Sequence, residues 1–270
     1  MSGTGPEERP GSPGPRPSAG GVGGDFGAPD VHPVQWSVII PAYNEAARLP
    51  RYLEAVVSDF DGRGDAYEVI VVDDGSRDAT VRIVEDFARR HRRVRVLRLP
   101  ANQGKGAAVR AGMLAARGRF RLFTDADGAT PIGELKRLEP AVLAGADVAI
   151  GSRALVDPGV SIVTRPHRVL AGRVFNWLRA RLGIRGIADT QCGFKLFRGA
   201  VAEDLFTHVR TRGFAFDVEV LRLAQSRGYR IVEIPVNWAD QPGSKVGVLT
   251  DGPRMLGQVL LTRWRLGRSR

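Results

Sequence analysis

Two aspartates one residue apart are the side chains of this sequence whose type and spacing best suit chemistry. They follow the apolar segment 119–124, Arg-Phe-Arg-Leu-Phe-Thr, as Asp125 and Asp127. Alternate side chains of an extended segment point to the same side, so both carboxylates can face one point. Their charges repel, and a divalent cation that prefers oxygen ligands, Mg²⁺ or Mn²⁺, would remove that cost. The competing interpretation is a strand that runs into an ordinary Asp/Gly turn.

Alternating strands and helices must position this pair. We expect strands at 37–40, 68–72, 94–97, 119–124, 147–150 and 229–236. We expect helices at about 46–58, 105–116, 132–143, 165–182 and 217–226. One more helix is expected to begin with Ser76 or Asp78 as its cap and to end at about residue 91. Continuous apolar strands in β-α units predict an α/β fold with a mainly parallel sheet flanked by helices. Ligands of such sheets bind beyond the carboxyl ends of the strands.

Several polar side chains follow these strand ends. They are Tyr43, Glu45, Asp73, Asp74, Asp125, Asp127 and Arg153. Because the strands themselves are apolar, this convergence predicts a ligand site at one edge of the sheet.

Composition divides the 270 residues into three parts. Residues 1–33 are mostly Gly, Pro, Ser and Ala, so we expect a disordered tail with neither a signal nor an anchor. Residues 34–250 are expected to form one domain. No run of about 18 apolar residues occurs, so no spanning helix is predicted. The single cysteine, Cys192, excludes an internal disulfide and fits a reducing cytoplasm.

The net charge of +11 calls for an anionic partner. Residues 251–270 carry Leu256, Val259, Leu260 and Trp264 at helical spacing among arginines, which is typical of a basic amphipathic helix on a membrane surface. The alternative is a helix docked on its own domain. Nucleic acid is not expected, because carboxylates gathered at the strand ends would repel its phosphates.

Two common phosphate-binding devices are missing from the sequence. No Gly-x-Gly-x-x-Gly follows the first strand, and Gly104-Lys105-Gly106 is not followed by the Ser or Thr of a P-loop. We therefore expect phosphate to be held by a metal together with the cationic side chains of Lys105, Arg153 and Lys245.

Combined motifs give the sequence a family resemblance. They are 41–45 (Pro-Ala-Tyr-Asn-Glu), 72–76 (Val-Asp-Asp-Gly-Ser), 102–106 (Asn-Gln-Gly-Lys-Gly), 125–127, 189–197 (Asp-Thr-Gln-Cys-Gly-Phe-Lys-Leu-Phe), 213–219 (Gly-Phe-Ala-Phe-Asp-Val-Glu) and 243–246 (Gly-Ser-Lys-Val). Over roughly residues 36–250 the sequence resembles the family 2 inverting glycosyltransferases of the GT-A fold. Within this family it is similar to the dolichyl-phosphate β-glucosyltransferases, which are closely related to the dolichyl-phosphate mannosyltransferases.

The resemblance implies a role for each matching position. It places Pro41, Tyr43, Glu45, Asp73, Asp74, Lys105 and Asp125 at the nucleotide-sugar donor, Asp125 and Asp127 at a Mg²⁺ or Mn²⁺ ion, and Arg153, Arg168 and Lys245 at the acceptor's phosphate. Asp73 has an alternative role in shaping its turn. Asp189 and Asp217 are the candidate catalytic carboxylates, and either could instead hold a loop or cap a helix.

The resemblance implies inverting transfer of glucose from UDP-glucose to a polyprenyl phosphate of the dolichyl type. A phosphate nucleophile is already anionic and needs no strong base, whereas a hydroxyl acceptor would need one. The alternatives are a GDP-mannose-dependent mannosyltransferase and a family 2 enzyme with a hydroxyl acceptor. Relatives look anchored by an N-terminal membrane helix, where this sequence has a polar tail. We therefore expect a cytoplasmic protein, peripheral on the inner face of the cell membrane.

Overall fold

The computed structural model describes residue 1 and the ranges 34–163 and 186–241. Every element below belongs to the compact unit Pro33–Arg270. Some predictions concern residues that are not described: the tail, the helix at 165–182, Arg168, Lys245 and the helix at 251–270.

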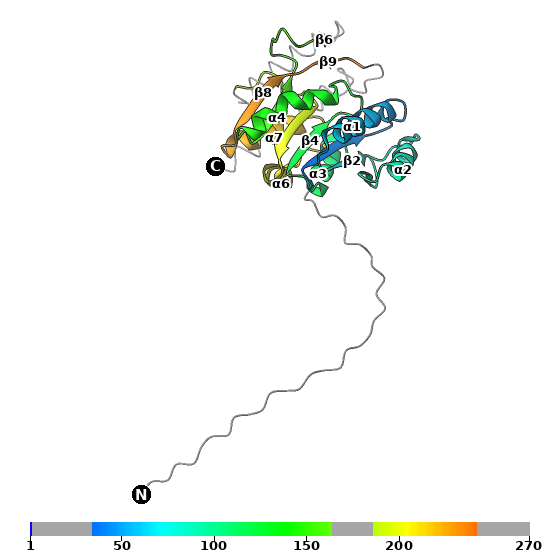
Figure 1. The fold of residues 1–270 in the computed structure, drawn as a ribbon, viewed down its shortest axis with the longest axis horizontal. Coiled ribbons are helices and arrows are strands. Elements are labelled where there is room, and N and C mark those ends of the chain that lie inside the picture. The colour runs from blue at the N-terminus through cyan, green and yellow to red at the C-terminus, as the bar shows by residue number, and fades with distance from the viewer. Residues whose placement is uncertain (2–33, 164–185, 242–270) are drawn as a thin grey trace. The chain divides into compact units, whose positions relative to one another are not determined.

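A seven-stranded sheet forms the centre of this unit, with strand order β3-β2-β1-β4-β7-β5-β8 (Figure 1). Its strands are β1 (Trp36–Ala42), β2 (Tyr67–Asp73), β3 (Val94–Arg98), β4 (Phe120–Thr124), β5 (Val148–Ser152), β7 (Phe194–Arg198) and β8 (Ile231–Pro235). All neighbours pair in parallel except β7, which runs antiparallel to both β4 and β5. The predicted α/β class with a mainly parallel sheet is confirmed.

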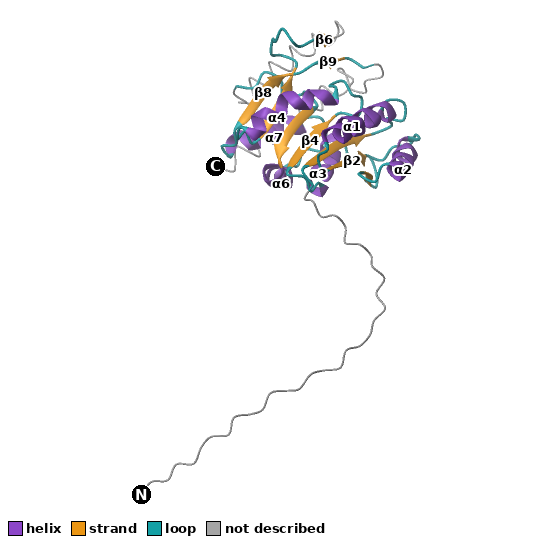
Figure 2. Cartoon of the chain, in the orientation of Figure 1, coloured by secondary structure: helices purple, strands orange, loops and turns teal. Residues whose placement is uncertain are grey.

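Helices cover both faces of the sheet (Figures 1 and 2). One face packs against α1 (Leu49–Arg63), α2 (Thr80–Arg90) and α4 (Leu135–Leu143), which the short 3₁₀ turn η1 (Ile132–Glu134) precedes. The other face packs against α3 (Lys105–Ala115), α6 (Gly199–His208) and α7 (Phe216–Ser226). Alternation within β1 serves both layers: Val38 and Ile40 enter the first core, and Ile39 enters the second. This double burial explains the unbroken apolar strands.

Strand β7 has the greatest consequence for function. Its first residue, Phe194, pairs with Thr124 at the end of β4, and Lys195 pairs with Ile150 of β5. Because β7 is antiparallel, the loop 186–193 that leads into it arrives at the edge where β4 and β5 end. Sequence reasoning did not predict β7 or α6, so it gave no reason for this loop to meet the strand ends.

Two smaller differences concern helix boundaries and the second sheet. Helix α1 begins at Leu49, with Pro50 in its first turn, and continues past the expected end at residue 58 to bury Phe60. Strands β6 (Ile162–Val163) and β9 (Trp238–Ala239) form a separate parallel pair that was not predicted. Among the described residues, no helix has both the length and the apolar character to cross a bilayer.

Candidate active site

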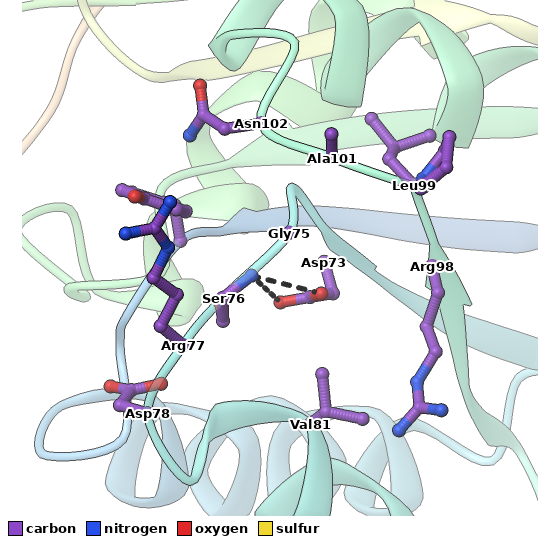
Figure 3. Close-up of a pocket in the computed structure, with 12 residues that line it drawn as sticks. Asp73, Gly75, Ser76, Arg77, Asp78, Val81, Arg98, Leu99, Ala101 and Asn102 are labelled. Atoms are coloured by element: carbon purple, nitrogen blue, oxygen red, sulfur yellow. Dashed lines mark hydrogen bonds between the residues drawn. The ribbon is translucent and has the colours of Figure 1, made fainter.

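A cavity of about 520 Å³ opens beside the ends of β1, β2 and β3 (Figure 3). Two of the predicted donor residues, Tyr43 and Asp73, line it, together with Gly75, Ser76, Arg77, Asp78, Val81, Arg98, Leu99, Pro100, Ala101 and Asn102. The lining combines an aromatic ring, carboxylates and guanidinium groups, which suits a polar ligand with a flat ring.

Both carboxylates of the 73–74 pair accept hydrogen bonds from backbone N–H groups, and Asp73 also lines the cavity. The Asp73 carboxylate accepts from the backbone N–H of Ser76 at 3.2 Å, a contact within the turn that follows β2 (Figure 3). Its role at the donor stays a prediction. Asp74 accepts from the backbone N–H groups of Gln103 at 2.7 Å and Gly104 at 2.9 Å. Burial raises the pKa of Asp74, although these two donors oppose the shift. Asp74 thus joins the loop after β2 to the loop before α3.

Arg48, which was not predicted as a site residue, connects Glu45 to the aspartate pair. Glu45 is buried and accepts from Arg48 Nε at 2.7 Å and Nη2 at 2.5 Å. Arg48 Nη1 also lies 3.8 Å from Asp127 Oδ2. The guanidinium therefore bridges a predicted donor residue and a predicted metal ligand.

The aspartate pair lies directly beyond β4. Lys105, the first residue of α3, places Nζ 2.6 Å from Asp125 Oδ1. Asp127 accepts from the backbone N–H of Ala129 at 3.1 Å. Burial raises the pKa of Asp127, and the charge of Asp125 adds to the shift, so the two carboxylates repel each other across the site. Burial alone would lower the pKa of Lys105, but Asp125 and Asp217 raise it, which keeps this ammonium charged.

The pair fits a hard divalent cation that shares its coordination with a substrate. Within the described ranges, no three His, Cys, Asp or Glu side chains gather as metal ligands. Two carboxylates are nevertheless the usual protein share for Mg²⁺ when substrate phosphates and water supply the remaining oxygens. The mutual repulsion of Asp125 and Asp127 is the penalty that such an ion would relieve.

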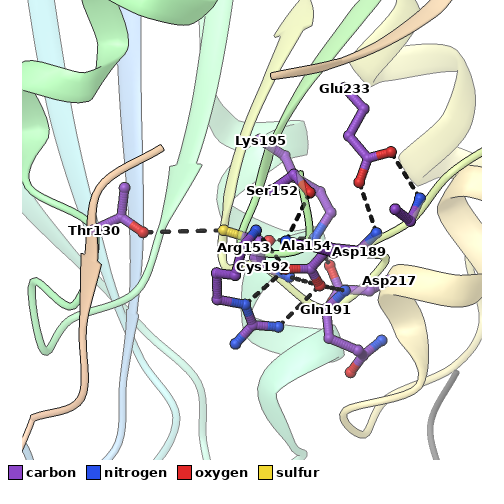
Figure 4. Close-up of polar contacts among 11 residues, drawn as sticks. Thr130, Ser152, Arg153, Ala154, Asp189, Gln191, Cys192, Lys195, Asp217 and Glu233 are labelled. Atoms are coloured by element: carbon purple, nitrogen blue, oxygen red, sulfur yellow. Dashed lines mark hydrogen bonds and ion pairs between the residues drawn. The ribbon is translucent and has the colours of Figure 1, made fainter. Parts of the chain in front are cut away.

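Arg153 and Asp189 form a bidentate ion pair at the end of β5 (Figure 4). Arg153 donates from Nε at 2.6 Å and from Nη2 at 2.9 Å, and the Asp189 carboxylate also accepts from the backbone N–H groups of Arg153, Gln191 and Cys192. Burial disfavours the Asp189 charge, but Arg153 and these donors prevail and lower its pKa to about 2. The backbone N–H of Asp189 in turn donates to the Glu233 carboxylate of β8 at 2.6 Å.

Asp217 forms a second ion pair, with a lysine that sequence reasoning missed. Lys195 of β7 is fully buried, and its Nζ donates to Asp217 Oδ1 at 2.5 Å and to the Cys192 carbonyl at 2.6 Å. Asp217 stands in the first turn of α7, where the helix dipole favours a negative charge. Burial still raises the pKa of Asp217, with Lys195 and Lys105 opposing the shift.

The structure thus brings six of the predicted residues into two groups at one sheet edge, while Tyr43 and Asp73 line the cavity. Lys105, Asp125, Asp127 and Asp217 are coupled on one side, and Arg153 and Asp189 are joined on the other. The residues missed were Lys195, Arg48 and Glu233. A lysine within the apolar run Phe-Lys-Leu-Phe is an available signal for Lys195, because a buried ammonium requires an anionic partner. The catalytic roles of Asp189 and Asp217 stay predictions.

Solved structures with this architecture are glycosyltransferases of the GT-A fold. Glucosyl-3-phosphoglycerate synthase of Mycobacterium tuberculosis, in complex with Mn²⁺ and UDP-glucose, aligns with a TM-score of 0.63 at 20% identity, covering 85% of this chain and 79% of that one. Mannosyl-3-phosphoglycerate synthase of Rubrobacter xylanophilus aligns with a TM-score of 0.64 at 18% identity, covering 87% and 74% of the two chains. At these identities the likeness establishes the fold alone.

Sequence comparison identifies the family within that fold. Residues 37–206 match the family model described as Glycosyl transferase family 2. Dolichyl-phosphate β-glucosyltransferase of Drosophila melanogaster is 42% identical over 230 residues, covering 80% of this chain and 71% of the relative. The human protein of that name is 38% identical over 260 residues, covering 87% and 79%. The chain belongs to the family 2 glycosyltransferases, and the resemblance to the dolichyl-phosphate β-glucosyltransferases is confirmed.

Proposed function

We propose that this glycosyltransferase transfers glucose from UDP-glucose to a polyprenyl phosphate of the dolichyl type, with inversion, giving a β-linked lipid-phosphate glucose. The names of the relatives support the sugar and the acceptor class. The M. tuberculosis enzyme of the same fold, solved with Mn²⁺ and UDP-glucose, supports the donor and the use of a divalent ion.

The observation that carries the proposal is the spacing of the two charged groups. Asp125 follows β4 and Arg153 follows β5, and only β7 lies between these strands. Neighbouring strands are about 4.8 Å apart, so the two groups begin roughly 10 Å from each other. We propose that a donor diphosphate at Asp125 and Asp127, one hexose and an acceptor phosphate at Arg153 bind in a row along this separation.

The state of the two candidate bases favours an acceptor that is already charged. Asp189 is bound by Arg153 and has a pKa of about 2, so it is a weak base at neutral pH. Burial raises the pKa of Asp217, but this carboxylate is itself buried and is already bound by the ammonium of Lys195. A hydroxyl acceptor would need a carboxylate to take its proton, whereas a phosphate monoester brings its own negative oxygen.

Positioning then explains most of the proposed reaction. Arg153, oriented by Asp189, holds the acceptor phosphate, and one phosphate oxygen attacks the anomeric carbon from the face opposite the leaving group. The bond from that carbon to the β-phosphate oxygen breaks, and its electron pair leaves with UDP. Lys105 faces the departing phosphate with a charged ammonium. A Mg²⁺ or Mn²⁺ held by Asp125 and Asp127 would neutralise charge on the diphosphate.

A single incubation tests this function. Protein, labelled UDP-glucose, polyprenyl phosphate and Mg²⁺ should yield a labelled product that extracts into organic solvent, with a β-anomeric signal by NMR. Omitting the lipid phosphate should abolish that product. Product from GDP-mannose but not from UDP-glucose would contradict the glucosyl assignment. Product with a free hydroxyl acceptor but none with the lipid phosphate would contradict the acceptor class.

A further inference from the structure

Gln191 carries a buried polar atom that no contact accounts for. Among the described residues, its Nε2 is a buried side-chain nitrogen with no hydrogen-bond partner. The backbone N–H of Gln191 donates to Asp189 at 3.0 Å, so the backbone is held in place while Nε2 lacks a partner. A buried donor left in this state is costly, and in native structures it usually has a specific reason.

The position of Gln191 on its loop points to that reason (Figure 4). Two residues before it, Asp189 holds Arg153. Two residues after it, Gly193 lies directly against Asp125. A Cβ added to this glycine would be 2.0 Å from Asp125 Oδ2. Two residues span at most about 7 Å of chain. Gln191 is therefore placed between the acceptor-side arginine and the donor-side carboxylate.

We infer that Gln191 determines sugar specificity by hydrogen bonding to a hydroxyl of the transferred hexose. The inference rests on the proposed function, which requires a hexose between Asp125 and Arg153. A hydroxyl suits the amide because it can accept from the –NH₂ group and can donate to the amide oxygen. A phosphate suits it less well, since phosphates here have Lys105 and Arg153 as charged partners. The bound sugar supplies the partner that Nε2 lacks.

Calorimetric titration of UDP and of UDP-glucose, each with Mn²⁺, tests this role. Gln191→Met keeps the length of the side chain and removes both polar atoms. We expect it to weaken binding of UDP-glucose about three- to tenfold and to leave binding of UDP unchanged. The matched control is Gln35→Met, since Gln35 precedes β1 at the opposite edge of the sheet, where its backbone pairs with Ala66 and Phe120. This variant should bind both ligands as the native protein does.

Deoxyglucose donors identify the hydroxyl by a double-mutant cycle. UDP-glucose analogues that lack one hydroxyl at a time should each bind more weakly to the native protein. For the hydroxyl that Gln191 contacts, the loss should not add to the loss caused by Gln191→Met. Additive losses at every hydroxyl would overturn the inference.

Thermal unfolding without ligand separates this role from a structural one. Removing an unpaired buried donor should raise the Tm of Gln191→Met by roughly 2–4 °C. A lower Tm, or a variant that fails to fold, would mean that the amide stabilises the protein itself, and would overturn the inference. If native protein binds both UDP and UDP-glucose and the variant matches it, only the role of Gln191 fails. If native protein binds neither nucleotide, the proposed donor fails as well.

Discussion

Three acids of the site are each matched by a base that lies about 20 or more residues away in the sequence. Asp125 has Lys105, Asp189 has Arg153, and Asp217 has Lys195. Taking such charges out of water is expensive, and the pairing compensates for that cost without making the pairs a large net source of stability. What the pairing provides is fixed charge at fixed places before substrate arrives, which is how electrostatic catalysis avoids reorganisation during the reaction.

The Lys195–Asp217 pair should behave as a buried ion pair when either member is removed. Lys195→Met or Asp217→Leu alone leaves one charge buried without compensation, so each should cost about 3–5 kcal/mol in the free energy of unfolding measured with urea. The double variant should cost much less than the sum of the two. Asp86→Ala, which removes an exposed pair with Arg89, is the control and should cost under about 1 kcal/mol. Additive single effects would contradict the pairing.

The ion pair of Asp189 should make stability depend on pH in a defined direction. Its pKa falls from 3.8 to about 2 on folding, so the carboxylate stabilises the native state above its ordinary pKa and loses this contribution as the pH falls toward 2. Asp189→Asn should therefore lower the free energy of unfolding by about 2 kcal/mol near pH 7. The difference from native protein should shrink below about pH 4. A difference that urea unfolding finds constant from pH 7 to pH 3 would refute this.

Among the elements, β7 and its entry loop unite the two sides of the site. The backbone N–H of Asp125 donates to the Gly193 carbonyl at 3.1 Å. A backbone hydrogen bond therefore joins the loop to the end of β4, in addition to the contact between Gly193 and the Asp125 side chain. Gly193 permits this approach only because it lacks a Cβ. The loop thereby sets the position of a predicted metal ligand.

Gly193→Ala should displace the Asp125 side chain and lower turnover by about 100-fold, which is the order expected for a misplacement near 1 Å. Affinity for Mn²⁺ in the presence of UDP should fall with it, as measured by electron paramagnetic resonance. Gly133→Ala serves as the control, because an added Cβ there meets nothing within 4 Å. Full Mn²⁺ affinity in Gly193→Ala would argue against the role of Asp125.

The elements differ in how far sequence could predict them. Strands β1, β2 and β4 were predictable because both of their faces are buried, which leaves unbroken apolar runs. The location of the aspartates at a ligand site was predictable because ligands of such sheets bind at the carboxyl ends of the strands. Strand β7 was missed because Lys195 interrupts its apolar pattern and because its antiparallel insertion depends on partners far away in sequence. The pairing of Asp217 with Lys195 required the fold, because the sequence signals that a buried lysine needs an anionic partner but not which one. Arg48, only three residues from Glu45, could have been found from the sequence and was missed.

At the scale of the whole molecule, the net charge of +11 remains to be assigned a partner. Much of the basic surface on α2 and β3 is already paired with acids, as in Arg90–Glu54 and Arg98–Glu85. The arginines of the C-terminal segment, which lies outside the described residues, are the basis for the proposed contact with the inner face of the cell membrane.

Sedimentation with anionic vesicles tests that contact. Changing Arg263, Arg265, Arg268 and Arg270 to Gln should weaken binding by on the order of 10³-fold, since each basic residue near an anionic surface contributes about 1 kcal/mol. The control changes Arg89, Arg90, Arg92 and Arg93 to Gln, which alters net charge equally at another place. Equal losses in both variants would mean that net charge alone, and not the C-terminal segment, drives binding.

The order of strands has a consequence for how such enzymes can be recombined. Residues 36–127 build β1 to β4 and contribute Tyr43, Lys105 and the aspartate pair, whereas residues 148–241 build β5 to β8 and contribute Arg153 and Gln191. The halves meet along the β4–β7 ladder and where α3 packs against α6 and α7. One crossover in the turn 128–131 would therefore join the nucleotide site of one parent to the sugar and acceptor preferences of another, with one strand pairing and one helix packing to repair.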